Sequence, residues 1–356
     1  MSRFLSEETA VLKPYTPGEQ PQDQRYCKLN TNESPFPPSP RVLEAVTRAE
    51  LEKLNLYSDP TCARFCRAVA ARYGVRPEQV IAGNGSDELL SFAFRAFCGR
   101  GKGVAYADIT YGFYPVWAKF YALDAKVIPL REDFSLCADD YLDFPGTLFI
   151  ANPNAPTGMA VPVPDVRRLL EADRNRVVVV DEAYVDFGTE SCVPLLAHYE
   201  NLLVIQTLSK SRSLAGGRIG FALGSPELIG GLNRVKYSFN PYNLNRLSIA
   251  AGAAAMEDEA YFRSCTAAVR ENREWTTAQL ENLGFRVLPS TANFIFAASG
   301  RISGGELYRT LKDRGVLVRH FDAPERIANF CRITIGSREQ MEQLIAAVRQ
   351  ILEVAP

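Results

Sequence analysis

Short apolar runs alternate with amphipathic stretches through the middle of the chain. Runs rich in β-branched residues predict seven strands, at residues 79–83, 103–107, 125–130, 147–152, 176–184, 202–207 and 218–224. Between most of them lie stretches with helical spacing, such as residues 87–97 and 164–173. This alternation predicts an α/β fold in which a mostly parallel seven-stranded sheet lies between helices. The four valines at 177–180 have no polar face, as expected of a central strand.

The pattern changes near residue 241. A long helical stretch at 260–284 ends at a glycine, the residue that commonly terminates helices. Three strand-like pieces follow, FRVLP, NFIFAA and CRITIG, with helical stretches around Leu307 and Leu344. Six prolines within the first 38 residues argue against regular structure there. We therefore expect an N-terminal arm (1–38), a large α/β domain (39–240) and a small α+β domain (241–356).

Composition and charge argue against several classes of protein. The 356 residues are 47% hydrophobic and carry a formal net charge of −1, which gives no electrostatic reason to expect nucleic acid or an anionic membrane as partner. The first residues lack the apolar core of a signal peptide, and no run reaches the ~18 apolar residues of a membrane span. Eight scattered cysteines without a CxxC pair, and two histidines, favour reduced thiols in a cytoplasmic protein without a metal site.

Polar, small or aromatic groups follow five of the predicted strands. The segments are GNGSDELL, ITYGFYP, NPNAPTG, DEAY and LSK. Because ligands of doubly wound sheets bind outside the carboxyl ends of the strands, these segments are expected to meet at one edge. Five such segments are hard to attribute to loops alone.

The segment GNGSDE has three interpretations. A dinucleotide-binding loop would need a small residue where Glu88 stands, so that match is poor. The backbone N–H groups of Gly85, Ser86 and Asp87 at a helix start would attract an anion, most naturally a phosphate. A simple N-cap formed by Ser86 or Asp87 is favoured by this motif alone.

The other segments add groups that suit one cofactor. Asp181 directly follows the valine run, and a buried carboxylate there needs a cation or hydrogen-bond donors. With Tyr111, Tyr184 and Lys210, the set suits pyridoxal 5′-phosphate. The lysine can bind its aldehyde, the aspartate can keep its pyridine nitrogen protonated, and an aromatic ring can stack on it.

The chain resembles the fold type I, class II aminotransferases, and within them the histidinol-phosphate branch. The resemblance runs through KLNTNESPFPPSP, NLYSDP, GNGSDELL, TYGFYPVW, NPNAPTG, VDEAYVDF, TLSKSRSLAGGRIG and FCRITIG, in order and spacing. It covers nearly the whole chain. It implies a pyridoxal-phosphate-dependent aminotransferase of histidine biosynthesis that acts on histidinol phosphate and 2-oxoglutarate.

The resemblance also implies a role for each residue at the cofactor. Ser209 and Arg218 would bind the phosphate group, and Gly85, Ser86 and Asp87 would complete the phosphate cup. Lys210 would carry the cofactor covalently and move the substrate proton. The ring would be held by the residues Asp181 (nitrogen), Tyr184 (hydroxyl) and Tyr111 (stacking).

Tyr57 in NLYSDP matches a tyrosine that members of the family extend to the phosphate in the partner subunit. That match implies an obligate homodimer with shared sites. In the family an asparagine directly precedes Pro-Thr-Gly and binds the ring oxygen, whereas this chain has Ala155. We expect the neighbouring Asn154 to take that role. Gln206 and Gly217 also depart from common family residues, without consequence for the chemistry.

Substrate recognition is assigned to two arginines and the arm. By resemblance, Arg332 would bind the carboxylate of glutamate and the phosphate of histidinol phosphate. Arg319 would be a second group that binds a substrate anion. An exposed charge on an edge strand is an equally favoured interpretation of this residue. Tyr15 and Asn32 from the arm are expected to line the pocket.

Other activities fit the same residues. Related branches transaminate aromatic amino acids or decarboxylate threonine phosphate. A catalytically silent regulator that binds the cofactor is less favoured, because the 38-residue arm is too short for a DNA-binding domain.

Overall fold

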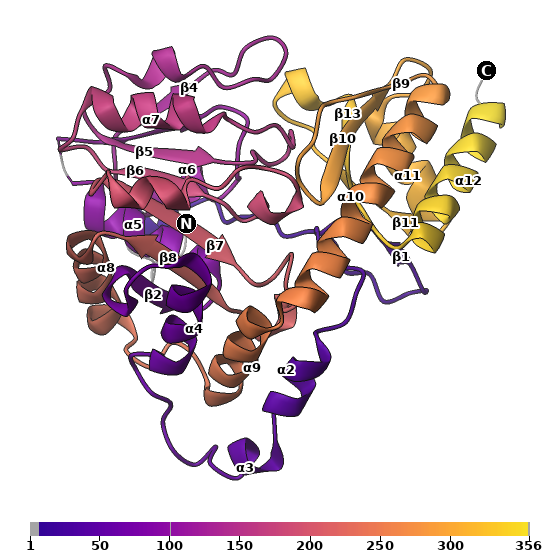
Figure 1. The fold of residues 1–356 in the computed structure, drawn as a ribbon. Coiled ribbons are helices and arrows are strands. Elements are labelled where there is room, and N and C mark those ends of the chain that lie inside the picture. The colour runs from indigo at the N-terminus through magenta and orange to yellow at the C-terminus, as the bar shows by residue number, and fades with distance from the viewer. Residues whose placement is uncertain (1–6, 100, 355–356) are drawn as a thin grey trace.

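The computed structural model describes residues 7–99 and 101–354. Its larger unit is built on a seven-stranded sheet, which Figure 1 shows with helices around it. The strand order is β2-β8-β7-β6-β5-β3-β4. All pairs are parallel except those of β8, which runs antiparallel to β2 and β7. In this order the strands are β2 (Val80–Gly83), β8 (Gly220–Gly224), β7 (Leu202–Thr207), β6 (Val178–Asp181), β5 (Thr147–Ala151), β3 (Val104–Ala107) and β4 (Ala125–Ile128). The seven predicted strands and the α/β fold class are confirmed.

The valine strand β6 is central in the sheet, and its side chains divide between two cores. Val178 and Val180 belong to one core and Val179 to the core on the opposite face. Alternate residues of a strand point to opposite faces, so a strand covered on both sides is apolar throughout. The first core contains residues of α2 (Pro40–Ala45), α4 (Ala63–Tyr73), α7 (Val163–Ala172) and α9 (Arg246–Glu257). The second contains residues of α5 (Ser86–Phe97), α6 (Tyr114–Phe120) and α8 (Pro226–Phe239).

The smaller unit is an antiparallel sheet with helices, which α10 joins to the larger unit (Figure 1). Its strand order is β12-β13-β10-β9. The strands are β9 (Phe285–Val287), β10 (Phe294–Ser299), β12 (Arg319–His320) and β13 (Phe330–Thr334). The helices are α10 (Glu259–Asn282), α11 (Gly304–Asp313) and α12 (Arg338–Val354). Gly284 has φ +82°, a conformation that favours glycine, just after the long helix.

The arm joins the smaller unit. Its strand β1 (Cys27–Lys28) pairs in parallel with β11 (Val316–Leu317), and Leu29 is fully buried in the core of the smaller unit. Two short helices, α1 (Glu7–Ala10) and α3 (Arg48–Leu51), complete the described elements at this end. Residues 1–6 of the predicted arm lie outside the described residues, as do residues 100 and 355–356.

The transition between the units differs from the predicted boundary at residue 241. Helix α9 packs against α2 and α4, and its apolar residues belong to the first core of the larger unit. The transition therefore falls at Asp258, which ends α9 and caps the N-terminus of α10 by accepting a hydrogen bond from the Tyr261 N–H group.

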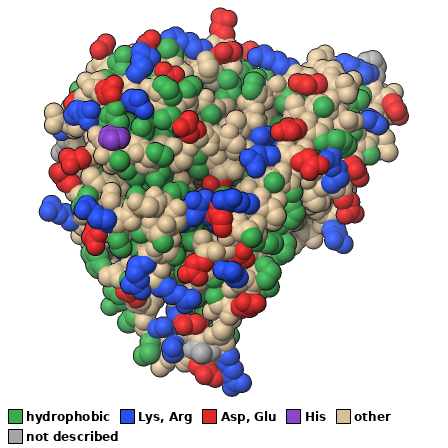
Figure 2. Space-filling view, viewed as in Figure 1, with side chains coloured by type: hydrophobic (Ala, Val, Ile, Leu, Met, Phe, Trp, Pro, Cys, Tyr) green, Lys and Arg blue, Asp and Glu red, His purple; other side chains and the backbone are tan. Residues whose placement is uncertain are grey.

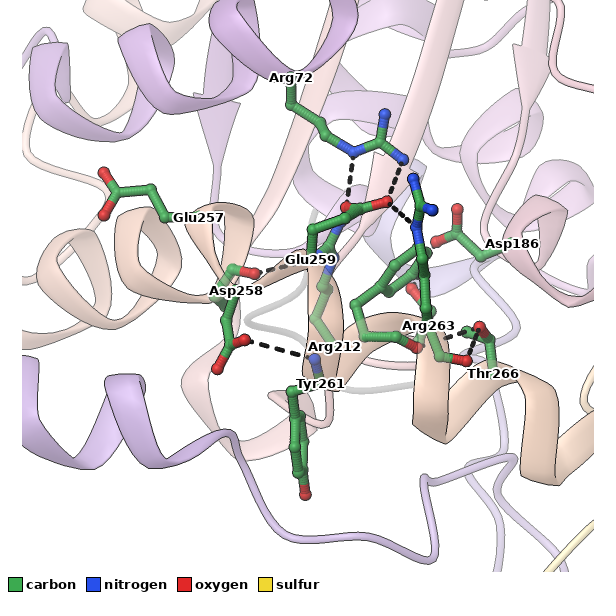
Figure 3. Close-up of polar contacts among 12 residues, drawn as sticks. Arg72, Asp186, Arg212, Glu257, Asp258, Glu259, Tyr261, Arg263 and Thr266 are labelled. Atoms are coloured by element: carbon green, nitrogen blue, oxygen red, sulfur yellow. Dashed lines mark hydrogen bonds and ion pairs between the residues drawn. The ribbon is translucent and has the colours of Figure 1, made fainter.

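A charge cluster fixes this transition, and we call Arg72, Arg212, Glu259 and Arg263 the junction cluster (Figure 3). The Glu259 carboxylate lies 3.0 Å from Nε of Arg72, 3.0 Å from Nε of Arg263 and 3.5 Å from Nη2 of Arg212. Burial opposes ionisation of Glu259, but the Arg263 hydrogen bond and the arginine charges outweigh it and lower its pKa. Arg212 also donates to the Ala255 carbonyl at the end of α9.

The outer surface mixes charges of both signs. Figure 2 shows blue and red side chains interspersed across one face of the molecule. In the described residues, the helices are too short or too polar to cross a membrane.

Candidate active site

A cavity of about 370 Å³ lies at the carboxyl ends of the central strands, between the larger unit, the arm and the smaller unit. Twelve of the predicted site residues line it. They are Tyr15, Asn32, Ser86, Asp87, Tyr111, Asp181, Tyr184, Ser209, Lys210, Arg218, Arg319 and Arg332. The strand ends therefore deliver their polar groups to one edge, as the sequence pattern predicts.

Lys210 follows β7 and reaches into this cavity. Its Nζ donates a hydrogen bond to the Thr31 carbonyl at 3.1 Å and lies 5.8 Å from the ring centroid of Tyr184. Burial, together with the charge of Arg332, lowers the pKa of Lys210 to about 8. A substantial fraction of this amine is therefore neutral near pH 8, which suits both covalent attachment and proton transfer.

Asp181 ends the central strand β6 and is 6% exposed. Its carboxylate accepts hydrogen bonds from the Tyr114 hydroxyl at 2.9 Å and the Ala183 N–H at 3.2 Å. Burial raises its pKa to about 6. Neither partner carries a charge, so the carboxylate remains able to hold a cationic N–H group.

Tyr114 is a site residue that the sequence analysis missed. It is fully buried at the start of α6 and packs edge-to-face with Tyr111, with ring centroids 5.7 Å apart. The Tyr111 hydroxyl donates to Asp87 at 2.6 Å. The signal was the second tyrosine of TYGFYP, three residues after Tyr111.

The loop before α5 forms an anion cradle with Arg218. Gly85 has φ +80°, and a Cβ atom there would lie 2.6 Å from Nη2 of Arg218, so a side chain would displace the guanidinium. Gly85 is the N-cap residue of the 12-residue helix α5, so Ser86 and Asp87 are its first residues and do not cap it. Asp87 is 3.4 Å from Arg218. Backbone N–H groups at a helix N-terminus beside a guanidinium group can bind a phosphate group.

Glu88 fastens this loop. Its carboxylate accepts a hydrogen bond from the Asn84 N–H at 2.7 Å and one from the Asn243 side chain. The glutamate that makes a poor dinucleotide loop therefore has a structural role here. Beside the loop, Ser209 Oγ accepts from Thr207 Oγ1 at 3.0 Å, and Thr207, which the sequence analysis missed, also lines the cavity.

Arg319 and Arg332 lie side by side on the smaller unit. They are direct partners in the antiparallel pair β12–β13. Arg332 donates to the Asn30 carbonyl at 2.9 Å, and its solvent-inaccessible Nε has no partner among the described residues. Arg319 is half-buried and donates to the carbonyls of Thr16 at 3.2 Å and Pro17 at 3.3 Å. Both guanidinium groups therefore line the cavity with donors that neutral carbonyls satisfy incompletely.

The arm closes one side of the cavity. The ring of Tyr15 stacks on Phe113 with centroids 4.2 Å apart. Asn32 lines the cavity, yet its amide donates to the Tyr184 hydroxyl at 3.1 Å.

The prediction for Asn154 does not hold. Its Oδ1 accepts from Thr110 Oγ1 at 2.7 Å, and its Nδ2 donates to the Ile109 carbonyl and to Thr157 Oγ1. The amide is thus committed to Thr157 of its own loop and to the segment at Ile109–Thr110, and Ala155 lines the cavity in its place. This stretch of the wall therefore offers an apolar side chain.

Tyr57 lies away from the cavity of its own chain. It is 79% exposed and stacks on Tyr242 with centroids 4.5 Å apart. That it reaches a partner subunit stays a prediction.

The residues of this cavity fit pyridoxal phosphate. The anion cradle formed with Arg218 can bind a phosphate, Asp181 can hold a protonated ring nitrogen, and Lys210 can provide a neutral amine. The fold and the site together define a pyridoxal-phosphate-dependent aminotransferase. The chain belongs to the aminotransferase class I and II family, whose model matches residues 24–348.

Similar proteins agree along the full length. The chain is 50% identical over 354 residues to a histidinol-phosphate aminotransferase of Marinomonas sp. (strain MWYL1), covering 99% of this chain and 100% of that one. It is 48% identical over 352 residues to one of Clostridium botulinum (strain Langeland), covering 99% of each. The fold matches the histidinol-phosphate aminotransferase of Sinorhizobium meliloti in complex with pyridoxal 5′-phosphate, with a TM-score of 0.88, 24% identity, and coverage of 99% and 98%.

Proposed function

We propose that the chain transfers the amino group of histidinol phosphate to 2-oxoglutarate. The observation that carries this proposal is the pair of register-matched arginines, Arg319 and Arg332, in the same cavity as Lys210. One substrate carries a phosphate and the other carboxylates, and a guanidinium binds both kinds of anion bidentately. The names of the full-length relatives support this choice of substrate.

The cofactor would be held at three points. Arg218, Ser209 and the N–H groups at the start of α5 would bind its phosphate. Asp181 would hold the proton of its ring nitrogen, and Tyr184 would donate to its ring oxygen. When bound, pyridoxal phosphate supplies the electron sink that makes the proton on the substrate carbon acidic.

Lys210 moves that proton. Because burial lowers its pKa to about 8, its neutral amine can take a proton from the substrate carbon and return one afterwards. Asp181 would stabilise the transition state, because its buried carboxylate would hold the proton on the ring nitrogen. Tyr114 keeps this carboxylate oriented through its 2.9 Å hydrogen bond.

The two substrates would use the same cations in turn. Arg332 would pair with the carboxylate of glutamate or 2-oxoglutarate through the part of its guanidinium group that lines the cavity. Arg319 would release the carbonyls of Thr16 and Pro17 to reach the phosphate of histidinol phosphate. The ring of Tyr15 would cover this end of the cavity.

The active unit would be a homodimer in which Tyr57 reaches the cofactor phosphate of the partner. Large apolar side chains are exposed next to it: Leu54 and Leu56 lie just before Tyr57 in the chain, and Tyr242 stacks on its ring. Exposed apolar groups gathered in this way are typical of a protein interface. Sedimentation is expected to give a dimer, and a fully active monomer would contradict the shared site.

A substrate comparison tests the proposed function. Purified protein loaded with pyridoxal phosphate is assayed with 2-oxoglutarate and either histidinol phosphate, phenylalanine or threonine phosphate. We expect histidinol phosphate to have the highest kcat/KM, by about 100-fold over phenylalanine. Equal values for phenylalanine would favour an aromatic aminotransferase, and release of CO₂ from threonine phosphate would favour the decarboxylase.

A further inference from the structure

The turn at residues 30–33 touches both side chains that act at the cofactor ring. The Thr31 carbonyl accepts a hydrogen bond from Lys210 at 3.1 Å, and Nδ2 of Asn32 donates to the Tyr184 hydroxyl at 3.1 Å. One turn of the arm therefore contacts the lysine and the tyrosine together. The Asn32 side chain is 1% exposed, and its amide nitrogen is directed at the Tyr184 side chain.

The amide of Asn32 is held in one orientation. The backbone N–H of Asn32 donates to Thr334 Oγ1 at 3.0 Å, and the Thr334 hydroxyl donates back to Oδ1 of Asn32 at 3.0 Å. Asn293 secures the same residue by donating to its carbonyl at 3.1 Å. With Oδ1 occupied as an acceptor, Nδ2 is the atom that faces Tyr184. The φ of +55° at Asn32 is a conformation that asparagine tolerates better than most residues.

This orientation determines the direction of the Tyr184 hydroxyl hydrogen. Because the phenol oxygen accepts from Asn32, its own hydrogen points elsewhere. In the described part of the chain, this hydroxyl has no acceptor. The ring is fixed by edge-to-face packing on Phe294, with centroids 5.0 Å apart. The free direction is the cavity.

We propose that Asn32 is a positioning residue that keeps the Tyr184 hydroxyl hydrogen directed toward the ring oxygen of bound pyridoxal phosphate. The alanine at position 155 makes this direction consequential, because Ala155 lines the cavity and its side chain offers no second donor. The inference rests on cofactor binding in the proposed function but not on which substrate is used.

The test uses the pH midpoint of the visible absorption change of bound cofactor, which reports hydrogen bonding to the ring oxygen and needs no substrate. Asn32→Asp keeps the size of the side chain and replaces the donor by an acceptor, so Tyr184 would turn its hydrogen to the carboxylate. We expect the midpoint to rise by about one pH unit. Tyr184→Phe, which removes the hydroxyl, is expected to give a similar rise.

The double variant separates positioning from a simple charge effect. If Asn32 acts through Tyr184, then Asn32→Asp adds little once Tyr184→Phe is present. Asn32→Gly, which keeps the backbone conformation and adds no charge, is expected to shift the midpoint by less than Asn32→Asp. Additive shifts in the double variant, or an unchanged midpoint in Asn32→Asp, would overturn the proposal. If the unsubstituted chain does not bind pyridoxal phosphate at all, the proposed function itself fails.

Discussion

The junction cluster and the cavity both contain several positively charged side chains, but these side chains have different partners in the two regions. In the junction cluster, three arginines surround the single carboxylate of Glu259 at 3.0–3.5 Å. In the cavity, the Nε atom of Arg332 has no partner among the described residues, and Lys210 donates a hydrogen bond to a backbone carbonyl. Arg218 has a carboxylate partner, Asp87 at 3.4 Å, which also accepts a hydrogen bond from the Tyr111 hydroxyl.

The difference indicates which charges serve structure and which serve ligands. Desolvating a charge is unfavourable unless a partner compensates, so a structural cluster is expected to be paired within the protein. In the cavity, the guanidinium and ammonium groups of Arg319, Arg332 and Lys210 donate to neutral carbonyls, so they remain able to bind the phosphates and carboxylates of cofactor and substrates. The following predictions separate the two regions by what each loses when a charge is removed.

The largest effect is expected from Lys210→Ala. The variant loses both the covalent attachment point and the proton carrier, so kcat should fall by about 10⁴-fold or more. Transamination of histidinol phosphate by the loaded protein measures it. Lys119→Ala, on the exposed side of α6, is the control and should be unchanged. Turnover of Lys210→Ala within tenfold of the parent chain would contradict the assignment.

Asp181→Asn is expected to come next. A neutral amide cannot hold the nitrogen proton, so about 3 kcal/mol of transition-state stabilisation is lost, roughly 100-fold in kcat/KM. Cofactor should still bind, which absorbance can verify. Tyr114→Phe, which removes only the supporting hydrogen bond, should lose about tenfold. Near-normal turnover in Asp181→Asn would mean that another group protonates the ring.

Substitutions of the two cavity arginines should lower kcat/KM to different extents for different substrates. Arg332→Lys is expected to weaken glutamate and histidinol phosphate together, because a lysine offers a point charge in place of a bidentate fork. Arg319→Ala should weaken histidinol phosphate more than glutamate. Loss of a charge-assisted pair costs about 1.5–3 kcal/mol, roughly ten- to a hundredfold in kcat/KM. Equal losses for glutamate, phenylalanine and histidinol phosphate in Arg319→Ala would remove the phosphate-clamp assignment.

A pH effect of about tenfold is expected for cofactor uptake. Because the pKa of Lys210 is lowered to about 8, roughly one-tenth of its amine is neutral at pH 7 and most of it is neutral at pH 9. The initial rate at which cofactor-free protein takes up pyridoxal phosphate should rise about tenfold over this range. A rate that rises only near pH 10 would show that burial does not depress this pKa.

The junction cluster should show the smallest effect on activity. Glu259→Gln removes the carboxylate that pairs with three arginines, so the free energy of unfolding should fall by about 1–2 kcal/mol while kcat/KM changes less than twofold. Denaturant unfolding measures the loss. Glu271→Gln, which removes an exposed ion pair on the same helix, is the control and should lose less than about 0.5 kcal/mol. A large fall in kcat/KM for Glu259→Gln would erase the distinction between the regions.

The strands of the larger unit could be predicted because each is a short apolar run between turn signals. The transition at Asp258 could not, because α9 is apolar on nearly every face and its periodicity does not indicate which unit it joins. Strands β11 and β12 are only two residues long, which is too short to produce an alternation of apolar and polar residues in the sequence.

Some site residues could likewise be predicted from the sequence, and others could not. Lys210 and Asp181 could be predicted because they follow apolar strands whose ends converge at one edge. The partners of Asn154 and the Tyr114–Asp181 bond could not, because they depend on contacts between segments distant in sequence. Side-chain direction within a loop is set by those contacts and not by spacing.

Chemical mapping of the cofactor tests the central claim most directly. Borohydride is added to the loaded protein, the chain is digested, and the labelled peptide is sequenced by mass spectrometry. We predict that the label lies on Lys210, between Ser209 and Ser211, at one equivalent per chain. A label on any other lysine, or on none while the protein remains active, would contradict the account of this cavity.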